Sequence, residues 1–162
     1  MTDLAGKTMA ELGPLLRERK ISPVELTDAV IARTDALDGR INAYISRRDE
    51  QARAEARTAE QEIMRGLYRG PLHGVPLALK DNICVAGEVT TMGAKIHQDF
   101  VPTHSATVHR KLTQAGAVFT GKLNLHEYAW GATTNNPHFG ACHNPWDLER
   151  IPGGSSGGSG AA

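Results

Sequence analysis

The sequence has little cysteine, few aromatic residues and no excess of charge of either sign. Its 162 residues include two cysteines, and 18 basic residues balance 18 acidic ones. Two isolated cysteines form neither a disulfide framework nor a C-x-x-C motif, which favours a reducing, cytoplasmic location. A formal net charge of zero removes the bulk electrostatic basis for binding nucleic acid or an anionic membrane.

Long apolar runs are also missing. Residues 1–7 lack the apolar centre of a signal peptide, and no stretch approaches the length of a membrane span. We therefore expect neither a membrane nor a nucleic acid as a direct partner. His138, Cys142 and His143 lie close in sequence but lack the paired spacing of a zinc site. No metal and no cofactor are expected.

Three helices are predicted in the first 69 residues. Thr8-Met-Ala-Glu11 is a capping box that starts one helix. Ser22-Pro-Val-Glu25 starts a second, because it places serine at the N-cap, proline at the first position and glutamate at the third. The third helix is predicted from Asp49 to about Leu67. We expect it to dock on a larger body through a thin apolar stripe of Ala52, Ala56, Ala59 and Ile63.

From Gly70 onward, short apolar segments alternate with glycine and proline. Leu72–Leu79 is predicted as a strand with its preceding turn, and Ala117–Gly121 as a second strand. Between them, Ser105–Ala115 has apolar residues at helical spacing, and Gly116 follows as a C-cap. A strand, a helix and a strand in this order predict a parallel βαβ unit, and hence an α/β fold.

Two short segments carry residues that could act chemically. Lys80 follows the first predicted strand, where burial would lower the pKa of its amine and make it a competent general base. The chain ends in IPGGSSGGSGAA, which has the composition of a flexible linker, although its glycines also permit tight turns. From these residues alone, a surface lysine and a flexible tail are open interpretations.

Four motifs, in this order, resemble the amidase signature family. They are GPLHGVPLALKDN at 70–82, GKLNLHEY at 121–128, NPWD at 144–147 and PGGSSGGS at 152–159. The resemblance implies an α/β fold in which N-terminal helices precede the first strands of a mixed sheet flanked by helices. It further implies that residues 1–162 are the N-terminal part of one domain, mainly helical over 1–69, with 70–162 starting the α/β core.

Members of that family hydrolyse or transfer amides with a Ser–Ser–Lys triad. The motif match makes Lys80 the base and Ser155 the bridging serine, a residue that the family holds through a cis peptide bond. Lys80 would take a proton through Ser155 and return it to the leaving amine. The acyl-forming serine and the oxyanion donors are expected roughly two dozen residues beyond Ser155. We therefore expect residues 1–162 to be inactive and poorly stable, or self-associating, on their own.

The resemblance leaves two branches of the family open. One is a stand-alone amidase acting on a small-molecule amide, either as a monomer or as a homo-oligomer. The other is the A subunit of the tRNA-dependent amidotransferase, which releases ammonia from glutamine and has the B and C subunits as partners. Leu125-His-Glu-Tyr128 replaces the Met-Asp-Glu-Phe run more usual in that protein, which favours the stand-alone hydrolase. A non-catalytic remnant is a further alternative.

Overall fold

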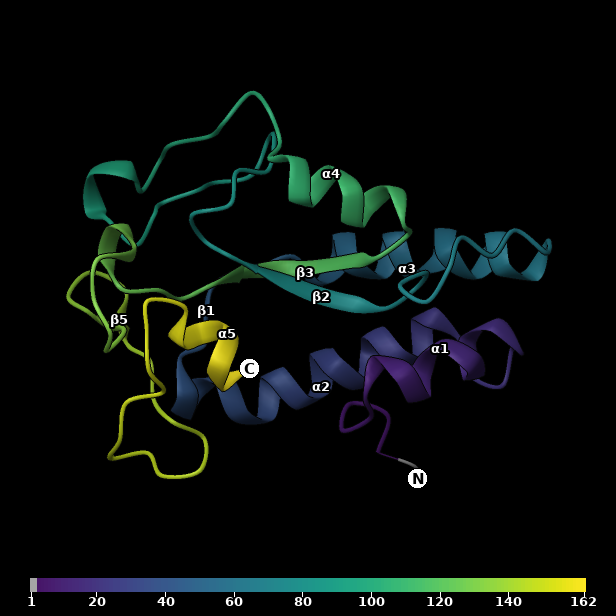
Figure 1. The fold of residues 1–162 in the computed structure, drawn as a ribbon, viewed down its shortest axis with the longest axis horizontal. Helices are drawn as coiled ribbons and strands as arrows, with labels where there is room; N and C mark the ends of the chain where they lie inside the picture. The colour runs from purple at the N-terminus through teal and green to yellow at the C-terminus, as the bar shows by residue number, and fades with distance from the viewer. Residues whose placement is uncertain (1–2) are drawn as a thin grey trace. The chain divides into compact units, whose positions relative to one another are not determined.

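The computed structural model describes residues 3–162 and has an α/β architecture, as the sequence predicts. In chain order its elements are α1 (Met9–Arg17), α2 (Pro23–Ile41), β1 (Tyr44–Arg47), α3 (Asp49–Met64), β2 (Pro76–Lys80), η1 (Lys95–His97), α4 (Thr107–Gln114), β3 (Val118–Leu123), η2 (Glu127–Ala129), β4 (Asn135–Asn136), β5 (Gly140–Ala141) and α5 (Gly157–Ala161) (Figure 1). No helix within residues 3–162 is both long enough and apolar enough to cross a membrane.

The larger of two sheets has three strands in the order β1-β3-β2. The backbone N–H of Val118 donates to the carbonyl of Val75 at 2.9 Å, and that of Asp81 donates to the carbonyl of Leu123 at 3.0 Å. Residue numbers thus increase in the same direction along β2 and β3, so the two strands are parallel and α4 connects them. The predicted βαβ unit is confirmed.

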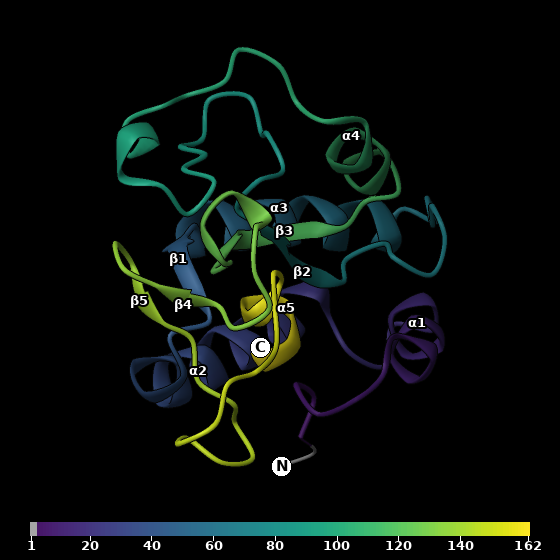
Figure 2. The same ribbon diagram turned by 60° about the vertical axis from the view of Figure 1, so that its left-hand side comes forward.

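Strand β1 pairs antiparallel with β3 and makes the sheet mixed. It was not predicted from the sequence, because its four residues lie between two long helices and are too few to show a clear alternation. A second, two-stranded sheet consists of β4 and β5, which lie side by side in Figure 2.

The chain forms two compact units. The first consists of the residues up to Asp35 together with Arg48–Leu77 and Arg110–Thr120. The second consists of Ala36–Arg47, Ala78–His109 and Gly121–Ala162. Lys80 and Ser155 both belong to the second unit.

Local sequence signals account for the helices of the first unit. In each predicted capping box the glutamate carboxylate accepts a hydrogen bond from the N-cap backbone. The N–H of Thr8 donates to Glu11 at 2.8 Å, and the N–H of Ser22 donates to Glu25 at 2.9 Å. Helix α3 ends at Met64, slightly earlier than predicted. Its buried face is the predicted stripe of Ala52, Ala56, Ala59 and Ile63.

Each unit has its own apolar cluster. In the first, Ala52 and Ala56 of α3 pack with Val118 of β3. In the second, Ile41 and Ala43 pack with Cys142 and with Ala161 of the C-terminal helix. The glycine-serine tail therefore contributes to a hydrophobic core, and its interpretation as a flexible linker is wrong.

Candidate active site

The second unit brings the two predicted site residues together. Lys80 is the last residue of β2, and Ser155 lies 75 positions later in the loop before α5. The Nζ of Lys80 donates a hydrogen bond of 2.6 Å to the Oγ of Ser155. The peptide bond between Gly154 and Ser155 is cis, the geometry that the family resemblance implies.

The surroundings of Lys80 favour its neutral form. Burial lowers the pKa of the Lys80 amine below the ordinary lysine value, because a charged ammonium loses hydration there. A neutral amine accepts a proton, and a hydroxyl at hydrogen-bond distance can supply one. The pair therefore has the geometry of a base and its proton donor.

A buried ion pair fixes the residue next to Lys80. The side chains of Asp81 and Lys122 are each 1% exposed, and the Lys122 Nζ lies 2.7 Å from an Asp81 carboxylate oxygen. The other carboxylate oxygen accepts hydrogen bonds from the backbone N–H and the hydroxyl of Thr91. Lys122 also donates to the hydroxyl of Thr90 at 3.0 Å. All these groups are satisfied, so the end of β2 is held firmly.

Sequence reasoning missed this pair. Both residues lie inside the quoted motifs, but they are 41 positions apart and no local pattern links them. The usable signal was the predicted parallel βαβ unit, because it places the ends of β2 and β3 beside each other.

The loop that carries Ser155 lies against neighbouring backbone. The N–H of His126 donates to the carbonyl of Ser155 at 3.0 Å, and the N–H of Gly158 donates to the carbonyl of Asn124 at 3.0 Å. A Cβ on Gly158 would lie 2.5 Å from the carbonyl oxygen of Ala43, a distance that real Cβ atoms do not adopt. Glycine is required here because the two backbones approach so closely.

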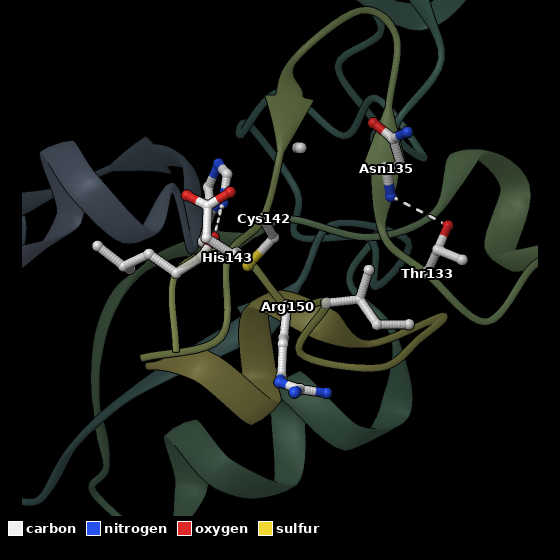
Figure 3. A pocket seen from close by; sticks show the side chains of 9 residues that line it. Thr133, Asn135, Cys142, His143 and Arg150 are labelled. Atoms are coloured by element: carbon white, nitrogen blue, oxygen red, sulfur yellow. Dashed lines mark hydrogen bonds between the residues drawn. The ribbon is translucent and has the colours of Figure 1, made fainter. Parts of the chain in front are cut away.

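A pocket of about 300 Å³ lies elsewhere in the second unit, and Lys80 and Ser155 do not line it (Figure 3). Burial raises the pKa of the Cys142 thiol to about 11, with the nearby Asp38 charge adding to the effect. This thiol is therefore protonated at neutral pH and is no nucleophile. The pocket is lined by Thr133, Asn135, Ala141, Cys142, His143, Leu148, Glu149, Arg150 and Ile151.

The histidines near this pocket have ordinary partners. The Nε2 of His138 lies 3.1 Å from a carboxylate oxygen of Glu127. The Nδ1–H of His143 donates to the carbonyl of Leu148 at 2.8 Å. Over the described part of the chain, no three histidine, cysteine, aspartate or glutamate side chains gather as a possible metal site.

The sequence model of the amidase family matches residues 25–162. The chain belongs to the amidase family. The A subunit of glutamyl-tRNA(Gln) amidotransferase from Moorella thermoacetica is 52% identical over 155 residues, which are 96% of this chain and 32% of that protein.

Solved structures agree with this membership. Peptide amidase from Stenotrophomonas maltophilia matches with a TM-score of 0.89 at 36% identity, over 98% of this chain and 34% of that one. The A subunit of glutamyl-tRNA(Gln) amidotransferase from Thermotoga maritima matches with a TM-score of 0.77 at 33% identity, over 100% of this chain and 32% of that one. The chain thus spans about a third of the length of the amidase relatives it matches.

The names of these relatives bear on the choice of branch. The run Leu125–Tyr128 favoured a stand-alone amidase. Identity of 52% over 155 residues to an amidotransferase subunit supports the alternative branch better than four residues support the first.

Proposed function

We propose that this chain supplies the base and the bridging serine of an amide-hydrolysing site, as the N-terminal part of the A subunit of a glutamyl-tRNA(Gln) amidotransferase. The observation that carries the proposal is the 2.6 Å hydrogen bond between Lys80 Nζ and Ser155 Oγ. These are the two residues that match the family's lysine and bridging serine. The 52% identity to the Moorella protein supports the choice of branch.

The proposed chemistry is a proton relay. Neutral Lys80 accepts the hydroxyl proton of Ser155, while Ser155 takes the proton of the acyl-forming serine, which we place beyond residue 162. That serine attacks the side-chain carboxamide carbon of glutamine. When the C–N bond breaks, the proton returns from Lys80 through Ser155 to the leaving nitrogen and ammonia departs. Water then hydrolyses the acyl-enzyme by the same relay.

A stand-alone amidase is the second candidate. It is favoured by the higher TM-score to the peptide amidase, 0.89 against 0.77 for the Thermotoga protein, and by the Leu125–Tyr128 run. The proton relay is the same for both candidates. They differ in the substrate and in whether ammonia is passed to partner proteins.

The test starts with the coding DNA past codon 162 and continues with the purified product of the whole open frame. With B and C subunits of a related amidotransferase present, we expect release of ammonia from glutamine. Lys80→Met and Ser155→Ala should each lower kcat by about 10³-fold or more, because relay members act as a unit. Lys95→Met changes an exposed lysine and is the matched control.

Three outcomes would contradict the proposal. Full activity of Lys80→Met would remove the lysine from the mechanism. Hydrolysis of peptide amides but not of glutamine would select the stand-alone branch. If the frame stops at codon 162, the chain should hydrolyse no amide. Amide hydrolysis by that chain, lost on Lys80→Met, would disprove our placement of the nucleophile beyond residue 162.

A further inference from the structure

Thr134 has an unusual backbone conformation close to the Ser155 loop. Its φ is +51°, in the left-handed region that β-branched residues rarely adopt. Its side chain is fully buried, at 0% exposure. A residue held in such a conformation needs surroundings that favour it strongly, and such residues cluster at functional sites.

The hydroxyl of Thr134 contacts the loop on both sides of Ser155. It donates to the carbonyl of Gly153 at 2.8 Å and accepts the backbone N–H of Gly157 at 3.0 Å. A hydroxyl has one proton to donate and lone pairs to accept with, so both bonds can exist at once. The two contacted residues lie two positions before and two positions after Ser155. The Thr134 side chain thus holds the backbone on both sides of Ser155.

The contact leaves no free space between the two segments. A Cβ built on Gly157 would lie 2.3 Å from the Thr134 Oγ1, so only glycine fits there. Thr134 is also held from the opposite side, because its carbonyl accepts the N–H of Cys142 at 3.1 Å. The threonine is therefore anchored to the β4–β5 segment independently of the loop that it binds.

We propose that Thr134 is a positioning residue for Ser155, which sets the distance from Ser155 Oγ to Lys80 Nζ by holding the backbone at Gly153 and Gly157. This role rests on the proposed function of Ser155 as the bridging serine. Thr134 touches neither substrate nor reacting atoms. It acts by geometry, and misplacement of a reacting group by about 1 Å can cost about 10²-fold in rate.

Thr134→Val tests the proposal, because valine keeps the shape and the β-branch but removes the hydroxyl. Thr134→Ser restores the hydroxyl and should behave like the unchanged protein. The matched control is Thr133→Val, since the Thr133 hydroxyl contacts the His126 ring and the Asn135 N–H at 3.3 Å each. All variants are made in the product of the whole open frame.

The first readout is hydrogen–deuterium exchange of the peptide covering residues 153–162. In Thr134→Val, we expect the Gly157 amide to exchange at least about tenfold faster, because it has lost its acceptor. Thr134→Ser and Thr133→Val should leave this exchange unchanged. Unchanged exchange in Thr134→Val would overturn the proposal. So would equal acceleration in Thr133→Val, because the effect would then not be specific to the Thr134 hydroxyl.

The second readout is the split between kcat and KM for glutamine. Thr134→Val should lower kcat by about 10- to 100-fold with little change in KM, since a misplaced relay affects proton transfer more than substrate binding. Faster exchange with full activity would overturn the positioning role of Thr134 and leave only a structural contact, whereas Ser155→Ala tests Ser155 itself. An inactive unchanged protein would refute the proposed function, and exchange would still test the contact. Should Thr134→Val not fold, Gly157→Ala disrupts the same contact from the loop side.

Discussion

The amine of Lys80 lies where burial disfavours its charged form. Burial lowers its pKa in the folded protein, whereas in the unfolded chain the amine has its ordinary pKa of about 10.4. Between the two values the unfolded chain binds more protons, so stability rises with pH across that window. At pH values below the folded-state pKa, the folded protein bears the full cost of burying the charged Lys80 amine.

Lys80→Met should therefore raise the urea midpoint of unfolding at pH 7.5. The gain should shrink as the pH rises toward about 10.4, because neutral lysine no longer suffers from burial. Urea titrations at several pH values, with Lys95→Met as the exposed control, measure this. A gain that stays constant with pH would mean that packing, and not charge, is responsible.

The Asp81–Lys122 pair gives a prediction with two matched aspartates. Asp81→Asn leaves a buried lysine charge unpaired and should lower the free energy of unfolding by about 3–5 kcal/mol. Asp28→Asn removes one of two carboxylate partners of Arg53 at an exposed position and should cost about 1 kcal/mol or less. Urea unfolding of both variants tests this.

A double variant distinguishes the effect of removing both charges from the effect of leaving one buried charge without a partner. The double change Asp81→Leu with Lys122→Met removes both charges and should cost much less than Asp81→Asn. If the double variant were the more damaged one, shape and hydrogen bonding at this position would outweigh the unpaired charge.

At the scale of elements, the buried face of α3 consists mainly of alanine. Ala56 has 0% exposure and packs near Val118, whereas Ala54 of the same helix is exposed. Ala56→Leu should cost about 1–3 kcal/mol of unfolding free energy, because the added carbons have no space. Ala54→Leu should be nearly neutral. Chemical unfolding of the two variants checks this, and equal losses would contradict the packing that we describe.

The helices and strands that could be predicted from the sequence are those specified by residues close together in the chain. The capping boxes at Thr8 and Ser22, the alanine stripe and the βαβ unit all follow from residues near one another in the chain. Strand β1 escaped prediction because its pairing with β3 joins segments about 75 positions apart.

The same limit applies to the site. Lys80 and Ser155 were predicted as site residues because each lies in a recognisable motif. Thr134 and the Asp81–Lys122 pair make contacts between distant segments, and only the predicted βαβ unit pointed to the second of these. That the Ser155 loop lies beside the end of β2 could be learned only from the three-dimensional structure, because the two segments are 75 positions apart.

At the scale of the whole molecule, several large apolar side chains are exposed. Both tryptophans of the sequence are among them, with Trp130 87% and Trp146 94% exposed, and Ile96 is 81% exposed. Where exposed apolar side chains adjoin one another, such surface marks contact sites or promotes association.

We therefore expect the 162-residue chain to self-associate. Sedimentation should show a mass that grows with concentration, accompanied by a blue shift of tryptophan emission as the indoles leave water. Trp146→Ser should weaken the shift. A chain that stays monomeric with a sharp two-state melt would contradict this expectation.

The raised pKa of Cys142 also makes the two cysteines chemically different. Cys142 is buried and holds its proton at neutral pH, whereas Cys84 is partly accessible. Alkylating reagents require the thiolate, so a maleimide at neutral pH should modify Cys84 and spare Cys142. Residues 1–162 thus offer a single attachment point for a fluorophore or spin label, four residues after Lys80.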